Sequence, residues 1–294
     1  MRSHGKKCPP GISRALALSR HFARPGSMAA CGFMVAFVIF DSAAIALSSN
    51  ARGYPPASPL DAFLLLYYGE PEHAPSSRFY VTVPITWLMG QALFFAYIAC
   101  ALFWANGGRG RQFLLRAGSS RVWWSSLCLA VLTMTLVRFL ASIAVCMAFP
   151  AVSFLLGIKP SVGGPFPIGS LGPSPQVAPH LAFSVLLPQI LLAQLLAFLS
   201  LNLGAFWSFA CVAAFSALSA IAPGALLFGD WSMLARNAIC CPDAVSPVAI
   251  ETFSLLLCTL IWAVGALGVA SRVELMQEPV NIIGAKCCPT KRSC

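Results

Sequence analysis

The stretch that decides the fold is residues 122–148, VWWSSLCLAVLTMTLVRFLASIAVCMA, in which Arg138 is the only charged residue. A helix that crosses a bilayer needs roughly 20 mostly apolar residues, and this stretch exceeds that length. It also lacks the strict alternation of polar and apolar residues that is typical of membrane β-strands. The stretch therefore predicts a membrane-spanning α-helix.

The rest of the chain has the same character. Of its 294 residues, 58% are hydrophobic and 10% are charged, with a mean hydropathy of +0.79, whereas soluble domains carry about 25% charged residues. Backbone polar groups in lipid must bond within the structure, so long apolar stretches must be helical. We therefore expect an all-α, polytopic membrane helix bundle with six transmembrane helices. Its other five predicted spans are 28–49, 80–104, 178–201, 204–228 and 251–271.

Lysine and arginine set the expected orientation, because cytoplasmic loops are enriched in them. Fourteen lie in residues 1–27, the 105–121 loop and the tail 272–294, against four in the three other loops. We expect both termini in the cytoplasm, with a basic segment at 1–27, a membrane domain at 28–271 and a tail at 272–294. The net charge of +10 is then a topology signal facing the bilayer, and nucleic-acid binding is not expected.

The first outer loop contains a short helix signal, SPLDAFLLLYYGE, at residues 58–70. Its ten or so residues are too few to cross a bilayer, so an interfacial or half-inserted helix is expected, with Tyr67 and Tyr68 at headgroup level. The residues that favour its start and its end are Ser58, Pro59, Asp61 and Gly69.

Three other segments carry structural signals. Residues 11–22 can form an amphipathic interfacial helix, and residues 229–239 a short outer element. The loop at 149–177, with eleven glycine or proline residues, is expected to be irregular. Spans four and five are separated by almost nothing, which predicts a tight antiparallel turn near Asn202 and Gly204.

Ionisable side chains inside a bilayer are costly and therefore mark functional candidates. Counting about 1.5 Å per residue from the cytoplasmic ends places Asp41 roughly 20 Å deep and Arg138 roughly 24 Å deep. Opposite charges at similar depth predict an ion pair, either a static bridge or part of a substrate path. Weaker candidates, expected to hydrogen-bond between helices, are Gln91, Gln189, Gln194 and His180.

Motifs for catalysis or cofactor binding are missing from the sequence, which contains no HExxH, GxSxG or phosphate-binding GxxxxGK[ST] pattern. A zinc site in CCPTKRSC, residues 287–294, would lack a nearby histidine ligand. We therefore expect no metal, no cofactor and no enzyme activity on this chain.

The predicted architecture resembles the membrane subunits of type-2 ABC exporters. The resemblance covers the interfacial N-terminal helix, six spans, a basic loop between spans two and three, a tight turn between four and five, and an outer element before six. Three local strings are similar to an uncharacterised bacterial permease-like group: VPITWL at 83–88, RAGSSRVWW at 116–124 and GDWSML at 229–234. The resemblance implies a permease subunit that pairs with a second permease subunit and is driven by an ABC ATPase on a separate chain.

The resemblance also assigns roles within the basic loop. Residues 111–118 would be the coupling helix, with the apolar contact to the ATPase from Phe113, Leu114 and Leu115 and the acidic groups of the partner met by Arg111 and Arg116. Arg121, Trp123 and Trp124 would anchor the start of span three at the membrane interface. Positive-inside charge and an aromatic belt would explain the same arginines and tryptophans without a partner.

Two other functions stay open on the sequence. One is a non-transporting membrane scaffold, sensor or immunity protein that works through its basic ends and outer loops. The other is an intramembrane enzyme built around Asp41.

Overall fold

The structure is a computed structural model that describes residues 27–52, 56, 58–69, 84–106, 119–157, 177–221, 228–238, 240 and 244–284. Within these residues the chain is all-α, and five helices are long and apolar enough to cross a membrane. They are α2 (Ser27–Arg52), α4 (Ile85–Asn106), α6 (Ser120–Leu155), α7 (Val177–Ile221) and α8 (Pro247–Gly284). The shorter elements are α3 (Pro59–Tyr67) and the 3₁₀ turns η2 (Phe228–Asp230) and η3 (Leu234–Arg236).

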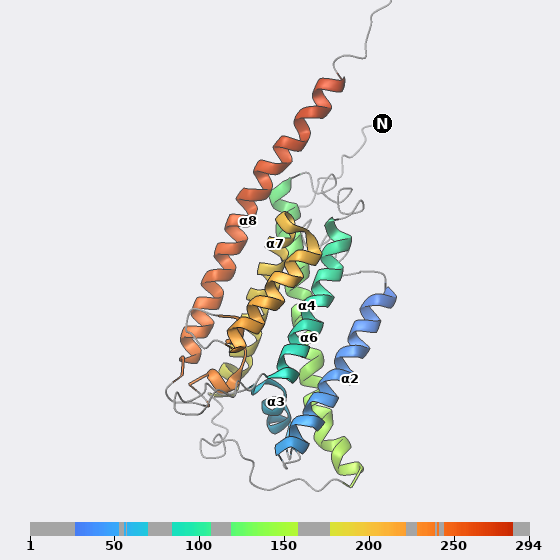
Figure 1. The fold of residues 1–294 in the computed structure, drawn as a ribbon, viewed down its shortest axis with the longest axis vertical. Coiled ribbons are helices and arrows are strands. Elements are labelled where there is room, and N and C mark those ends of the chain that lie inside the picture. The colour runs from blue at the N-terminus through green and yellow to red at the C-terminus, as the bar shows by residue number, and fades with distance from the viewer. Residues whose placement is uncertain are drawn as a thin grey trace, which may run out of the picture.

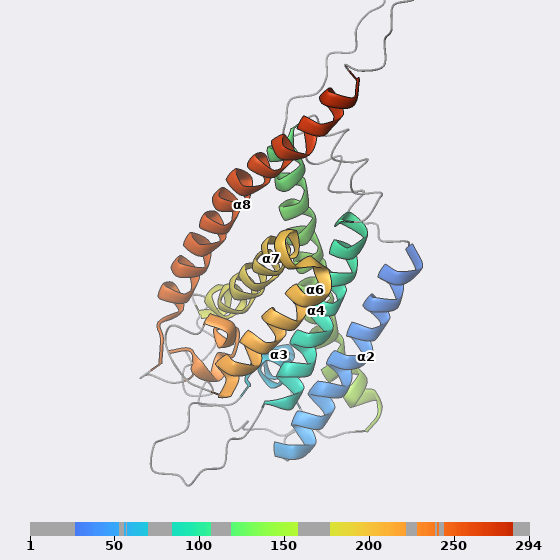
Figure 2. The ribbon, with the colours of Figure 1, turned by 45° about the horizontal axis from the view of Figure 1, so that its top comes forward.

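The long helices form a bundle whose two ends differ (Figure 1). The start of α2, the end of α4, the start of α6 and the end of α8 are all the upper ends of these helices in the view. The short elements α3, η2 and η3 lie at the bottom, as the rotated view in Figure 2 also shows. The first and last described helices therefore begin and end on the same side of the bundle.

Helix α7 reverses direction within its length. Its 45 residues would extend about 67 Å as a straight helix, roughly twice the hydrocarbon thickness of a bilayer. Gly204 interrupts the helix with φ 78° and ψ 163°, a backbone conformation that glycine adopts without a steric penalty. The two arms, yellow and golden in Figure 2, meet at their upper ends. The tight turn expected near Gly204 is confirmed.

The start and the end of α7 both lie next to η3. Leu181, near the start of α7, shares a buried cluster with Leu234 of η3. Two residues further on, Arg236 donates to the carbonyl oxygens of Ser219 and Ala220, near the end of α7, at 2.9 and 2.7 Å. These bonds satisfy carbonyls that a helix end otherwise leaves without partners.

Two helices extend further than the sequence predicts. Residues 149–155, expected to be part of an irregular loop, continue α6 to Leu155 with Pro150 inside the helix. Proline lacks the N–H that would bond four residues back but otherwise accepts helical φ, so α6 passes through it. Helix α8 begins at Pro247, and its backbone continues to Gly284, into the segment expected to be a tail.

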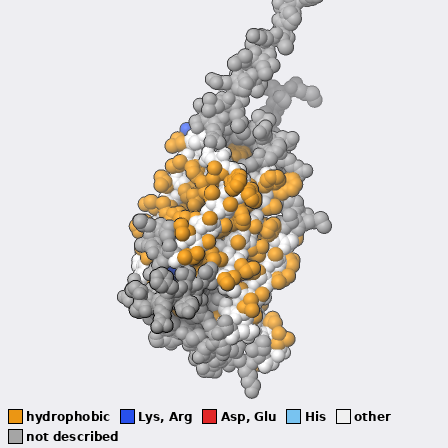
Figure 3. Space-filling model, in the orientation of Figure 1, with side chains coloured by type: hydrophobic (Ala, Val, Ile, Leu, Met, Phe, Trp, Pro, Cys, Tyr) orange, Lys and Arg blue, Asp and Glu red, His pale blue; other side chains and the backbone are white. Residues whose placement is uncertain are grey.

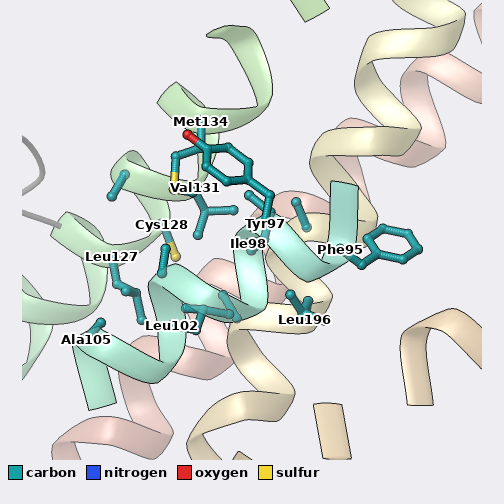
Figure 4. Close-up of a cluster of buried hydrophobic side chains, with 14 of the residues drawn as sticks. Phe95, Tyr97, Ile98, Leu102, Ala105, Leu127, Cys128, Val131, Met134 and Leu196 are labelled. Atoms are coloured by element: carbon teal, nitrogen blue, oxygen red, sulfur yellow. The ribbon is translucent and has the colours of Figure 1, made fainter. Parts of the chain in front are cut away.

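The main core lies where α4, α6 and α7 meet (Figure 4). Its side chains are apolar and almost fully buried, and they include Phe95, Ile98, Leu102, Leu127, Val131 and Leu196. Association of helices in lipid depends on close packing, because lipid tails are as apolar as the side chains.

The outer surface of the described helices is apolar. Figure 3 shows hydrophobic side chains over most of the described part of the visible face, and large residues such as Leu155, Phe206 and Leu267 are more than two-thirds exposed. An exposed apolar surface of this extent is expected where lipid replaces water as the solvent.

Candidate functional site

The two charged residues expected inside the bilayer form a bidentate ion pair. Arg138 of α6 donates from Nη1 to Oδ2 of Asp41 at 3.0 Å and from Nη2 to Oδ1 at 2.9 Å. The Asp41 side chain is fully buried and that of Arg138 is 5% exposed. Paired geometry of this kind is the strongest form of the Arg–carboxylate interaction.

Residues one helical turn away complete the surroundings of the pair. On α6, Ser142 lies four residues after Arg138 and donates to Asp41 Oδ2 at 2.9 Å. On α2, Phe37 lies four residues before Asp41, and its ring centroid is 4.5 Å from the Arg138 guanidinium carbon. Residues four apart share one face of a helix, so each helix contributes two groups to the same side.

Helix α3 covers the pair from the bottom of the bundle. Ser58 and Asp61 form a capping box at its start, and Gly69 follows its end with φ 68°. The Tyr68 carbonyl accepts from the Ala235 N–H at 2.8 Å, which ties α3 to η3. The helix start and stop expected from the sequence are thus confirmed.

The orientation of Tyr67 corrects an expectation, because its ring is buried instead of lying at headgroup level. It packs against Phe63 of α3 and Phe139 of α6, with ring centroids 4.9 and 6.4 Å away. Burial raises the pKa of the Tyr67 hydroxyl above its ordinary value, because the phenolate would lose its hydration. Tyr67 is therefore a neutral group beside the ion pair.

A cavity of about 20 Å³ lies beside the pair, enough for one water-sized group. Its lining comes from α2, α3, α4, α6 and α7, and consists of Phe40, Asp41, Leu66, Tyr67, Thr86, Trp87, Gly90, Gln91, Phe94, Arg138 and Gln189.

Four of the lining side chains carry a buried polar atom that has no hydrogen-bond partner within the described part of the chain. These atoms are Tyr67 Oη, Trp87 Nε1, Gln91 Oε1 and Arg138 Nε. Buried polar atoms are normally paired, so four around one cavity mark it as the strongest candidate site. The amide nitrogen of Gln91 donates to Ser232 Oγ at 3.4 Å, which leaves its oxygen for the cavity.

The weaker candidates divide between this site and other places. Gln91 and Gln189 line the cavity, whereas Gln194 does not. His180 Nδ1 lies 2.9 Å from Glu251 Oε1, where the first turns of α7 and α8 meet. The sequence did not single out Trp87 or Ser142, although the four-residue spacing of Ser142 from Arg138 was a usable signal.

The tryptophans at the start of α6 are placed differently from the expectation. Arg121 is exposed, but Trp123 and Trp124 are buried. Trp124 donates from Nε1 to the Trp262 carbonyl at 2.8 Å, and its ring lies so close to Gly265 that a side-chain carbon there would collide with it. Gly265 makes room for the Trp124 ring, so this ring packs α8 onto α6. Because it is buried there, it does not anchor the helix at the lipid surface.

The expected coupling residues, Arg111, Phe113, Leu114, Leu115 and Arg116, lie outside the described residues, as do the 11–22 helix and the 287–294 cysteines. Within the described residues, no group of three or more His, Cys, Asp or Glu could hold a metal ion. What the site can do is bind a small polar group in surroundings of low polarity.

No protein-family model, curated protein or solved structure matches the chain. The fold, its apolar surface and its five long helices define the class: this is an integral, multi-pass, helical membrane protein.

Proposed function

We propose that the chain is the permease subunit of an ATP-driven, ABC-type exporter in a bacterial cytoplasmic membrane, with its ATPase on a separate chain. The observation that carries this proposal is the reversal of α7 at Gly204. Counting each arm of α7 as a crossing gives six, and six crossings return the chain to its starting side. The positive-inside rule makes that side the cytoplasm.

The order of the elements supports the same proposal. The resemblance to type-2 exporters calls for a tight turn between the fourth and fifth crossings and a short outer element before the sixth. Gly204 supplies the first, and η2 and η3 supply the second. In this arrangement α3 lies at the outer end, and residues 107–118 connect α4 to α6 on the cytoplasmic side, where an ATPase would dock.

The experiment is gentle purification of the tagged protein from its native membrane, with identification of co-purifying chains by mass spectrometry and photo-crosslinking to an ATP analogue. We expect an ATP-binding subunit with the wild type and its loss in the Phe113→Asp/Arg116→Glu variant. Phe22→Asp/Arg24→Glu, which makes the same two changes in the other basic segment, is the matched control and should retain the subunit.

Two results would contradict the proposal. The first is reproducible absence of any ATP-binding chain from intact wild-type protein, which would favour a scaffold, sensor or immunity protein. The second is equal retention of the ATPase by the Phe113→Asp/Arg116→Glu variant and the control, which would place the docking surface elsewhere.

A further inference from the structure

The polar atoms of the cavity beside the ion pair specify the chemistry of its ligand. Arg138 Nε–H and Trp87 Nε1–H can only donate hydrogen bonds, Gln91 Oε1 can only accept, and the Tyr67 hydroxyl can do either. All four side chains are at least nine-tenths buried, and all four line the same cavity. A ligand that satisfies them must therefore both accept and donate.

The charges around the cavity exclude further kinds of ligand. The bidentate bonds between Arg138 and Asp41 leave the centre neutral as a whole. A small anion would meet the acceptor oxygen of Gln91 and the Asp41 carboxylate, and a small cation would meet two N–H donors. A neutral oxygen with its own proton avoids both conflicts, because it accepts from the N–H groups and donates to the amide oxygen.

The size of the cavity and the position of its mouth limit the ligand further. The cavity volume of about 20 Å³ fits one water-sized group. Its most accessible lining residue is Thr86 of α4, which is exposed. Phe40 of α2, Leu66 of α3 and Gly90 of α4 are half-buried. The mouth of the cavity is therefore at the seam between α2 and α4, near the start of α4.

We propose that this cavity is a binding site for a single neutral hydroxyl group, held between Arg138, Trp87 and Gln91. The hydroxyl is carried either by water or by a membrane amphiphile whose polar end enters between α2 and α4. The proposal does not depend on an ATPase partner, so it stands or falls separately from the exporter assignment.

Radiolytic hydroxyl-radical labelling tests the site, because ionised bound water oxidises the side chains next to it even where bulk solvent has no access. The protein is labelled in its native lipid and again after delipidation, in water enriched in ¹⁸O. Trp124 is the internal control, because it is buried like Trp87 but its N–H is bonded to a backbone carbonyl. We expect Trp87 and Tyr67 to be oxidised several-fold faster than Trp124.

The two sources of the hydroxyl give different patterns. Fast labelling in both preparations identifies water, and fast labelling only after delipidation identifies an amphiphile that excludes water until it is removed. Labelling of Trp87 and Tyr67 at the rate of Trp124 in both preparations would overturn the proposal.

A substitution tests whether fast oxidation of Trp87 depends on the bound hydroxyl group or on general access of solvent. Gln91→Leu removes the acceptor and should slow the oxidation of Trp87 several-fold. Gln194→Leu is the matched control and should leave the rate unchanged. It removes another buried amide oxygen, which has no hydrogen-bond partner among the described residues and lies away from the cavity. An unchanged rate in Gln91→Leu would refute the proposed ligand geometry. If Gln91→Leu lowers the melting temperature by more than the control does, Trp87→Phe with Tyr67 as the reporter gives the same test.

Discussion

Replacing either Asp41 or Arg138 alone should strongly destabilise the protein. The two single costs should add up to more than the cost of replacing both residues together. In Asp41→Asn an amide NH₂ replaces a carboxylate oxygen, so a donor faces a donor and the Arg138 charge loses its counterion. In Arg138→Gln the fully buried carboxylate keeps, among the described residues, only the bond from Ser142. Each single change leaves an uncompensated charge in surroundings of low polarity.

The magnitude follows from that uncompensated charge. Breaking a buried pair by removing one partner costs about 3–5 kcal/mol, which shifts the unfolding equilibrium roughly a hundred- to several-thousand-fold. The double variant Asp41→Asn/Arg138→Gln buries two neutral amides that can bond each other, so its cost should fall short of the sum of the single costs. We expect a coupling energy of about 2–3 kcal/mol.

The assay is reversible unfolding in mixed micelles with increasing SDS, followed by tryptophan fluorescence. Ser208→Ala combined with Asp41→Asn is the control pair, because the Ser208 hydroxyl bonds the carbonyl of Gly204 in the same helix. These two changes should add within about 0.5 kcal/mol. The reasoning is refuted if the double variant at the ion pair costs the full sum of its single variants, or if each single variant costs under about 1 kcal/mol.

Three further substitutions and one titration test other parts of the structure. Gly265→Val should separate α8 from the Trp124 ring and cost about 1–3 kcal/mol in the same unfolding assay. Arg236→Met should leave two carbonyls at the end of α7 without donors and cost about 1–3 kcal/mol, with unchanged helix content by circular dichroism. Gly204→Ala should cost about 1–3 kcal/mol, because alanine is strained at a positive φ combined with an extended ψ. Tyr67, whose folded pKa is raised, should stay un-ionised above pH 10 in an ultraviolet titration; since the unfolded chain ionises at about pH 10, stability should fall as pH rises past that value.

Sequence reasoning succeeded where the physical cause is local. A capping box and a glycine stop fixed α3, and Gly204 fixed the turn in α7, because these signals act within a few residues. The contact between Asp41 and Arg138 was predictable because two opposite charges at similar depth in a bilayer are stabilised by pairing. The cavity was not, because it depends on the inward rotation of Tyr67 and Trp87, which long-range packing decides.

The ion pair has a second consequence for how α2 is held. Much of α2 faces outward, with Val35, Ile39 and Leu47 more than half exposed, and in lipid an apolar helix face gains little from one orientation over another. The bidentate bonds from Arg138 and the ring contact of Phe37 therefore fix the rotation of α2 about its axis. A change that breaks the pair should release α2 before it disturbs the core of α4, α6 and α7. Because Asp41 and Arg138 both line the cavity, the same pair also holds α2 in place as one of its walls.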